Sequence, residues 1–167
     1  MQKAAFFLII LLIFFTFSSC AEWEMPSCRD VLGEIIAAEI GLPAGRVYSS
    51  KADEGEDEYL PDSLVNVLYG NGSRPVMADG WLDIALFLPS SSHPCEIAVF
   101  LCNSEDTATD TARMLLRRLD TLRTANGDSE LVSYFDTATV TVMRNYVLFL
   151  ISSDVESAVK TAAKIIG

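Results

Sequence analysis

The stretch Cys95-Glu96-Ile97-Ala98-Val99-Phe100-Leu101-Cys102 decides the fold of this 167-residue chain. It is short, apolar and rich in β-branched and aromatic residues, and turn-forming residues flank it, so we predict a β-strand. Ile97, Val99 and Leu101 share one face of this strand, and the residues between them share the other. Because both faces are mostly apolar, we expect both to be covered.

A long amphipathic helix is predicted directly after this strand, with Asn103 or Ser104 as its N-terminal cap. Apolar residues recur at spacings of three and four and form one stripe, made of Ala108, Ala112, Leu115, Leu116, Leu119 and Leu122. Acidic residues lie early in the helix and arginines late, which complements the helix dipole. The arginines at 113, 117, 118 and 123 are interpreted as a solvated helix face, with an anion-binding patch as the alternative.

Three more helices and three more strands follow from the same signals. The helices are expected at residues 27–40, 61–69 and 153–166, and the strands at 82–88, 137–142 and 146–151. Ser27 with Asp30 and Ser153 with Glu156 have the spacing of a capping box at the start of a helix. Arg144-Asn145 is expected to be the turn of the last hairpin.

These elements predict an α+β fold in the order ααββαββα. Two hairpins and helices long enough to cover one face indicate a two-layer domain with a four-stranded, mainly antiparallel sheet. We expect a single domain over residues 27–167, with an acidic mobile loop at 44–58. Five of the eight residues 51–58 are acidic, and little there can be buried. Calcium binding is the functional alternative for this loop, but the alternating Asp spacing of a calcium loop is absent.

The N-terminus has the pattern of an export signal. Lys3 precedes an uncharged, nearly all apolar run at residues 4–17, which is shorter than the roughly 20 residues of a membrane-spanning helix. Phe17-Ser18-Ser19-Cys20 resembles a bacterial lipobox, so we predict a signal peptide over 1–19, lipidation of Cys20 and a tether over 20–26. Ordinary signal peptidase cleavage after Ala21 and a retained N-terminal anchor helix are the alternatives.

The charge of the chain limits its partners. Its formal net charge is −11, and it becomes −12 without residues 1–19, which contribute only Lys3. Such an acidic body is repelled by nucleic acid and by anionic lipid headgroups. We therefore expect no nucleic-acid partner, membrane contact through the N-terminal lipid, and an envelope protein or polymer as the partner.

Three cysteines remain if Cys20 carries the lipid. Cys95 and Cys102 lie at opposite ends of one predicted strand, about 23 Å apart, so they cannot form a disulfide with each other. Cys28 can pair with one of them, or all three are small buried residues.

Several segments together carry a resemblance: the exported start with its cysteine, Leu68-Tyr69-Gly70, Glu96-Ile97-Ala98-Val99-Phe100, Arg118-Leu119 and Asn145-Tyr146-Val147-Leu148. They resemble a family of small, mostly Gram-positive bacterial lipoproteins that is known only as a domain of unknown function. The similarity spans residues 27–160 and implies the fold and the localisation, but no catalytic residue. This chain departs from the family at Cys95, where Asp is frequent, and at Arg144, where Gly is frequent.

Few residues point to chemistry. His93, the single histidine, lies in a turn beside Cys95, and with Cys102 it matches no recurring zinc spacing. No nucleophile elbow, phosphate-binding glycine loop or redox Cys-x-x-Cys pair occurs. We therefore predict no catalytic residue, metal site or cofactor. The leading hypothesis is a non-catalytic binding module anchored to the outer face of the cell membrane, and a small surface hydrolase that uses loop carboxylates is the alternative.

Overall fold

The computed structural model describes residues 25–70, 80–126 and 132–167. Within these ranges five strands form one sheet: β1 Gly45–Ser49, β2 Trp81–Pro89, β3 Glu96–Cys102, β4 Thr139–Met143 and β5 Tyr146–Ile151. Their spatial order is β1-β2-β3-β5-β4, and all neighbouring strands are antiparallel. The central strand is β3, and all of its residues are buried, as the apolar pattern on both of its faces predicts.

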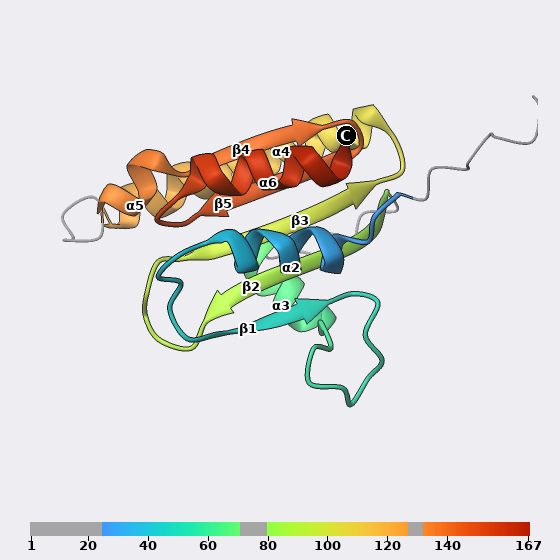
Figure 1. Cartoon of the computed structure of the whole chain (residues 1–167), viewed down its shortest axis with the longest axis horizontal. Helices are drawn as coiled ribbons and strands as arrows, with labels where there is room; N and C mark the ends of the chain where they lie inside the picture. The colour runs from blue at the N-terminus through green and yellow to red at the C-terminus, as the bar shows by residue number, and fades with distance from the viewer. Residues whose placement is uncertain (1–24, 71–79, 127–131) are drawn as a thin grey trace, which may run out of the picture.

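Helices cover both faces of this sheet (Figure 1). The described helices are α2 Cys28–Ala38, α3 Asp62–Tyr69, α4 Glu105–Asn126, α5 Val132–Thr137 and α6 Val155–Ile166. One face packs against α2 and α6, and the other against α3, α4 and α5. The domain therefore has three layers, with the sheet in the middle.

The predicted α+β class and the antiparallel sheet are confirmed, but the predicted two layers, four strands and order ααββαββα are wrong. The fifth strand is β1, which lies inside the segment 44–58 that the sequence predicted to be a loop. Short helix α5 was also missed, because residues 128–136 have no clear amphipathic stripe. The third layer arises because α2 and α6 pack on the face of the sheet opposite to α4.

Side-chain alternation along β3 separates two hydrophobic cores. Ile97 and Val99 belong to the core under α2 and α6, whereas Phe100 belongs to the core under α4. Leu115 and Leu119 of α4 are buried as expected, but they do not share a core with Ile97. The central strand and the longest described helix therefore bury these residues in two separate cores.

A β-bulge in β2 directs neighbouring side chains to opposite faces of the sheet. Trp81 pairs with Cys102 and Asp83 pairs with Leu101, so Leu82 is an extra residue that bulges outward and is about half exposed. Such a bulge re-aims the side chains on either side of it. Trp81 consequently faces α4, where its Nε1 donates to the hydroxyl of Thr111 at 2.8 Å, while Asp83 faces α2.

The buried carboxylate of Asp83 stabilises the start of α2. One oxygen accepts the backbone N–H of Cys28 at 2.8 Å, and the other accepts the hydroxyl of Ser50 at 2.9 Å. A negative charge at a helix N-terminus is favourable, and the hydrogen bonds offset the free-energy cost of burying the carboxylate. Ser27 also caps this helix by accepting the N–H of Asp30, as predicted.

Two further helix starts can be compared with the sequence. Ser104 accepts the N–H of Thr107 at the start of α4, which confirms one of the two predicted caps. The predicted capping box of Ser153 with Glu156 is wrong, because Asp154 is the cap of α6 and accepts the N–H of Ser157. The carboxylate oxygen of an aspartate can cap a helix as well as the hydroxyl oxygen of a serine can, so the sequence did not separate the two neighbouring positions.

The predicted signal peptide, the lipidation site Cys20 and most of the tether lie outside the described residues. Within the described ranges, no helix combines the length and the apolar character that crossing a membrane requires. The described chain begins beside the β4–β5 hairpin, where the hydroxyl of Tyr146 donates to the carbonyl of Pro26.

Candidate functional site

Three polar side chains meet at the end of β3 that is remote from Pro26. Arg118 of α4 donates to both carboxylate oxygens of Glu96, from Nε at 3.2 Å and from Nη2 at 2.6 Å. Tyr69 of α3 donates its hydroxyl to the same carboxylate at 2.8 Å. The remaining Nη1 of Arg118 donates to the carbonyl of Leu68 at 2.7 Å. These bonds join β3, α3 and α4, and we call Tyr69, Glu96 and Arg118 the triad.

Burial strengthens the electrostatic interactions among the three side chains of the triad. Glu96 and Tyr69 are each 5% exposed, and the guanidinium of Arg118 lies 5.4 Å from the centre of the Tyr69 ring. Burial alone lowers the pKa of Arg118, but the charge and hydrogen bonds of Glu96 outweigh burial and raise it. Burial, followed by the charge of Glu96, raises the pKa of Tyr69 well above its usual value. The triad therefore holds a charged Arg118 and a neutral Tyr69 near neutral pH.

A cavity of about 650 Å³ opens beside the triad, between the C-terminal end of α3 and the middle of α4. Its lining residues are Val67, Leu68, Tyr69, Gly70, Met114, Arg117, Arg118, Thr121 and Leu122. Two of them are arginines and none is acidic, although the whole chain has 23 acidic residues against 12 basic ones. The cavity is thus an amphipathic, locally positive hollow in an acidic protein.

The four late arginines of α4 have different roles. Arg118 belongs to the triad, and Arg123 donates to the carbonyls of Phe135 and Ala138. Arg113 pairs with Asp110 in the exposed i,i+3 arrangement expected of a solvated face. Arg117 is exposed, and no carboxylate of the described residues lies within 4 Å of its guanidinium. The interpretation of all four as a solvated face is therefore incomplete.

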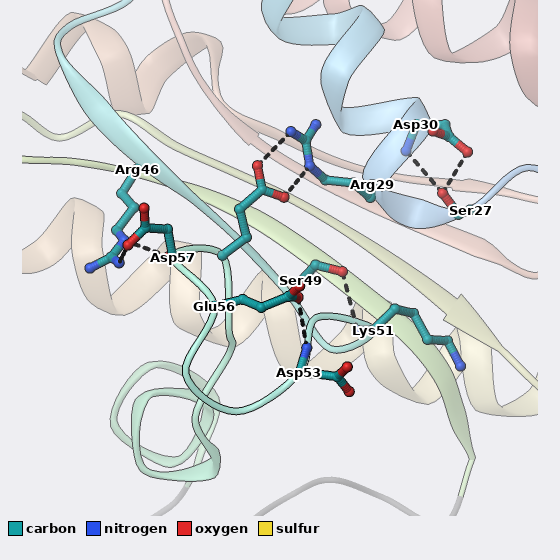
Figure 2. A network of polar contacts seen from close by, with 10 residues as sticks. Ser27, Arg29, Asp30, Arg46, Ser49, Lys51, Asp53, Glu56 and Asp57 are labelled. Carbon is teal, nitrogen blue, oxygen red and sulfur yellow. Dashed lines mark hydrogen bonds and ion pairs between the residues drawn. The ribbon is translucent and has the colours of Figure 1, made fainter.

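Two arginines pair with carboxylates of the acidic loop after β1 (Figure 2). Glu58 forms two hydrogen bonds with Arg29 of α2, at 2.6 and 2.7 Å, and Asp57 pairs with Arg46 at 3.4 Å. Glu56 accepts the backbone N–H of Asp53. In the described residues no three His, Cys, Asp or Glu side chains form a group that fits a metal ion. The loop carboxylates are spread over separate contacts and do not converge as a hydrolase would require.

The remaining candidate residues are packed into the structure. His93 lies with its ring 4.8 Å from that of Tyr134, and its Nδ1 accepts the N–H of Cys95. Cys28, Cys95 and Cys102 are all buried and free, so the alternative of one disulfide is wrong. Burial raises the pKa of Cys95 to about 12, and it also raises the pKa of the other two thiols.

The sequence analysis missed the triad, although two signals for it were present. Glu96 is an acid at the start of an otherwise apolar buried strand, and a buried acid requires a partner. Arg118 lies three residues after Leu115 and four before Leu122, so it falls beside the apolar stripe of α4. Together, a buried acid on the strand and a cation on the helix that covers it would have predicted an ion pair between Glu96 and Arg118.

A search of the chain against protein-family models, curated proteins and solved structures finds no match. Three of the segments singled out in the sequence, 68–70, 96–100 and 118–119, contribute Tyr69, Glu96 and Arg118 to one cluster. Arg144 adopts a left-handed backbone with φ of 54° in the β4–β5 turn. This conformation favours glycine.

Proposed function

We propose that this protein is an exported lipoprotein whose folded domain is a non-catalytic binding module, anchored to the outer face of the cell membrane through Cys20. The apolar run at residues 4–17 and the lipobox-like Phe17-Ser18-Ser19-Cys20 support the export and the anchor. The observation that carries the binding role is the saturated triad beside an open cavity. Glu96 accepts three hydrogen bonds there, which hold its carboxylate in one position beside the cavity.

The placement of the cavity supports a role in contacts away from the membrane. Pro26 is held at the Tyr146 end of the sheet, where β3 ends. Five residues lie between Cys20 and Pro26, so a lipid on Cys20 would hold this end within about 20 Å of the membrane. Glu96 pairs with Ile151 at the other end of β3, roughly 20 Å further along the strand. A partner approaching from outside the cell would therefore meet the triad before the tether.

Replacement of the lipidated residue tests the anchor. In the Cys20→Ala variant we expect the protein to leave the membrane fraction for the medium, or to remain there with its signal uncleaved. Mass spectrometry of the wild-type N-terminus should find a mature chain that begins at Cys20 and carries a diacylglycerol. An unmodified chain beginning at Glu22 would mean ordinary signal peptidase cleavage and would contradict the lipoprotein assignment.

A further inference from the structure

The cavity beside the triad has one positive charge that no described residue neutralises. Glu96 compensates the charge of Arg118, and Arg118 also pairs with the carbonyl of Leu68 near the negative end of α3. Arg117 lines the same cavity and has no carboxylate partner among the described residues. Asp120, one turn along α4, pairs with Arg123 instead. Among the described residues, the uncompensated charge that a ligand meets here is therefore that of Arg117.

The rest of the cavity wall is largely apolar. Val67 of α3 is 78% exposed and contributes apolar surface to the wall. Leu68, Met114 and Leu122 are partly buried members of the core under α4 and also line the cavity. The volume of about 650 Å³ falls within the range typical of sites for small ligands.

We propose that this cavity binds a small amphipathic anion. Its carboxylate or phosphate group pairs with Arg117, and its aliphatic part lies on Val67, Met114 and Leu122. The triad positions this site, because Glu96 fixes Arg118 and thereby the spacing between α3 and α4. This inference deepens the binding role proposed above by naming the ligand class, but it does not depend on the lipid anchor.

Calorimetric titration of the full purified chain tests the proposal, with zwitterionic lipid nanodiscs as the carrier and empty nanodiscs as the blank. The probes form two matched pairs: N-acetyl-Leu-Leu with its C-terminal amide, and butyl phosphate with butanol. We expect at least one anion to bind about tenfold more tightly than its neutral partner. The anion that binds identifies the source, a peptide carboxylate or a phosphate ester.

Three variants assign the charge to the cavity. Arg117→Gln should weaken binding of the anion about fivefold to tenfold, whereas Arg117→Lys should retain most of it. Arg113→Gln removes an arginine from the same helix outside the cavity, so binding should not change. Because Arg117 and Arg113 are both exposed, the thermal midpoint should change little in all three variants, which excludes unfolding as the cause.

Equal binding of the anions and their neutral partners would overturn the proposal, as would anion binding that Arg117→Gln leaves intact or the absence of binding at millimolar concentration. Failure of the anchor is seen separately, because it appears as an unmodified mature N-terminus. If the chain proves to be secreted, the same titration is run in solution and its outcome stands.

Discussion

Glu96 and Arg118 form a buried ion pair that links the central strand to the longest helix. Their closest atoms, Oε2 and Nη2, are 2.6 Å apart, and the two side chains are only 7% and 20% exposed. Within the described residues the other ion pairs lie on the surface, with side chains 38% to 105% exposed. Desolvation therefore distinguishes this pair from the surface pairs. Burying its two charges costs free energy, and removing one partner costs more because it leaves the other charge buried and unpaired.

Removal of one partner of this pair should be strongly destabilising. Arg118→Met leaves the buried carboxylate of Glu96 with the Tyr69 hydroxyl as its remaining partner, so we expect a loss of about 3–5 kcal/mol in the free energy of unfolding. Urea denaturation of the purified chain measures this loss. The matched control is Arg113→Met, which breaks the exposed pair with Asp110 and should cost about 1 kcal/mol or less.

The double variant Glu96→Leu with Arg118→Met separates the cost of an unpaired charge from the value of the pair. It removes both charges and should recover much of the stability lost in Arg118→Met. A double variant as unstable as the sum of the two single variants would contradict this account, because it would mean that each residue acts independently.

Glu39 predicts a pH dependence of stability. It follows α2 and is 8% exposed, and neither carboxylate oxygen accepts a hydrogen bond from a described residue. Burial raises its pKa, the nearby Ser152 offsets part of that rise, and the charge of Asp154 adds to it. Because the folded pKa exceeds the unfolded one, protonated Glu39 favours the folded state. Its contribution is complete below the ordinary glutamate pKa of about 4.3 and is lost as the pH rises through the folded pKa.

Glu39→Gln should therefore be more stable than the wild type at neutral pH, with a difference that shrinks as the pH falls towards 4. Thermal midpoints measured across this range give the comparison. Glu34→Gln, an exposed site on the same helix, is the control and should follow the wild-type profile. A Glu39→Gln variant whose curve is parallel to that of the wild type would show that the pKa of Glu39 is the same in the folded and unfolded states, which would contradict the effect of burial.

The sequence was sufficient for the elements with strong patterns and insufficient for those fixed by neighbours. Strand β3 and helix α4 are long and periodic, so both were predicted close to their observed bounds. Strand β1 has five residues beside an acidic segment, and its pairing with β2 is what makes it a strand. Helix α5 has six residues, too few to be stable alone, so it depends on contacts that composition does not reveal.

The number of layers was predicted wrongly for a different reason. The apolar character of both faces of β3 already indicated cover on both sides, yet the helices were assigned to one face. Alternation states which residues share a face, but it does not state which helix covers that face. The triad could not be predicted for the same reason. Glu96 and Arg118 are 22 residues apart in the sequence, and only the crossing of α4 over β3 brings them together.

The three buried thiols should react slowly in the folded protein. Reaction requires the thiolate, and burial raises the pKa of Cys95 to about 12, with the charges of Glu39 and Glu96 as further causes. We expect Cys28, Cys95 and Cys102 to remain unmodified by iodoacetamide at pH 8 under native conditions and to react fully in guanidinium. Mass spectrometry counts the labels. Rapid native labelling of any one of the three would contradict the buried placement.

The separation of the two cores predicts additive effects across the sheet. Ile97 packs under α2 and α6 and Leu119 packs under α4, so the two side chains belong to different clusters. Leu119→Ala should cost about 2–5 kcal/mol and Ile97→Val about 0.5–1.5 kcal/mol. Because the two residues share no cluster, the loss in the double variant should equal the sum within about 0.5 kcal/mol in urea denaturation.

Leu115→Val with Leu119→Ala is the control, because both lie one turn apart in the same core and should couple more strongly. Coupling between Ile97 and Leu119 as large as in this control would mean that the sheet transmits repacking from one face to the other.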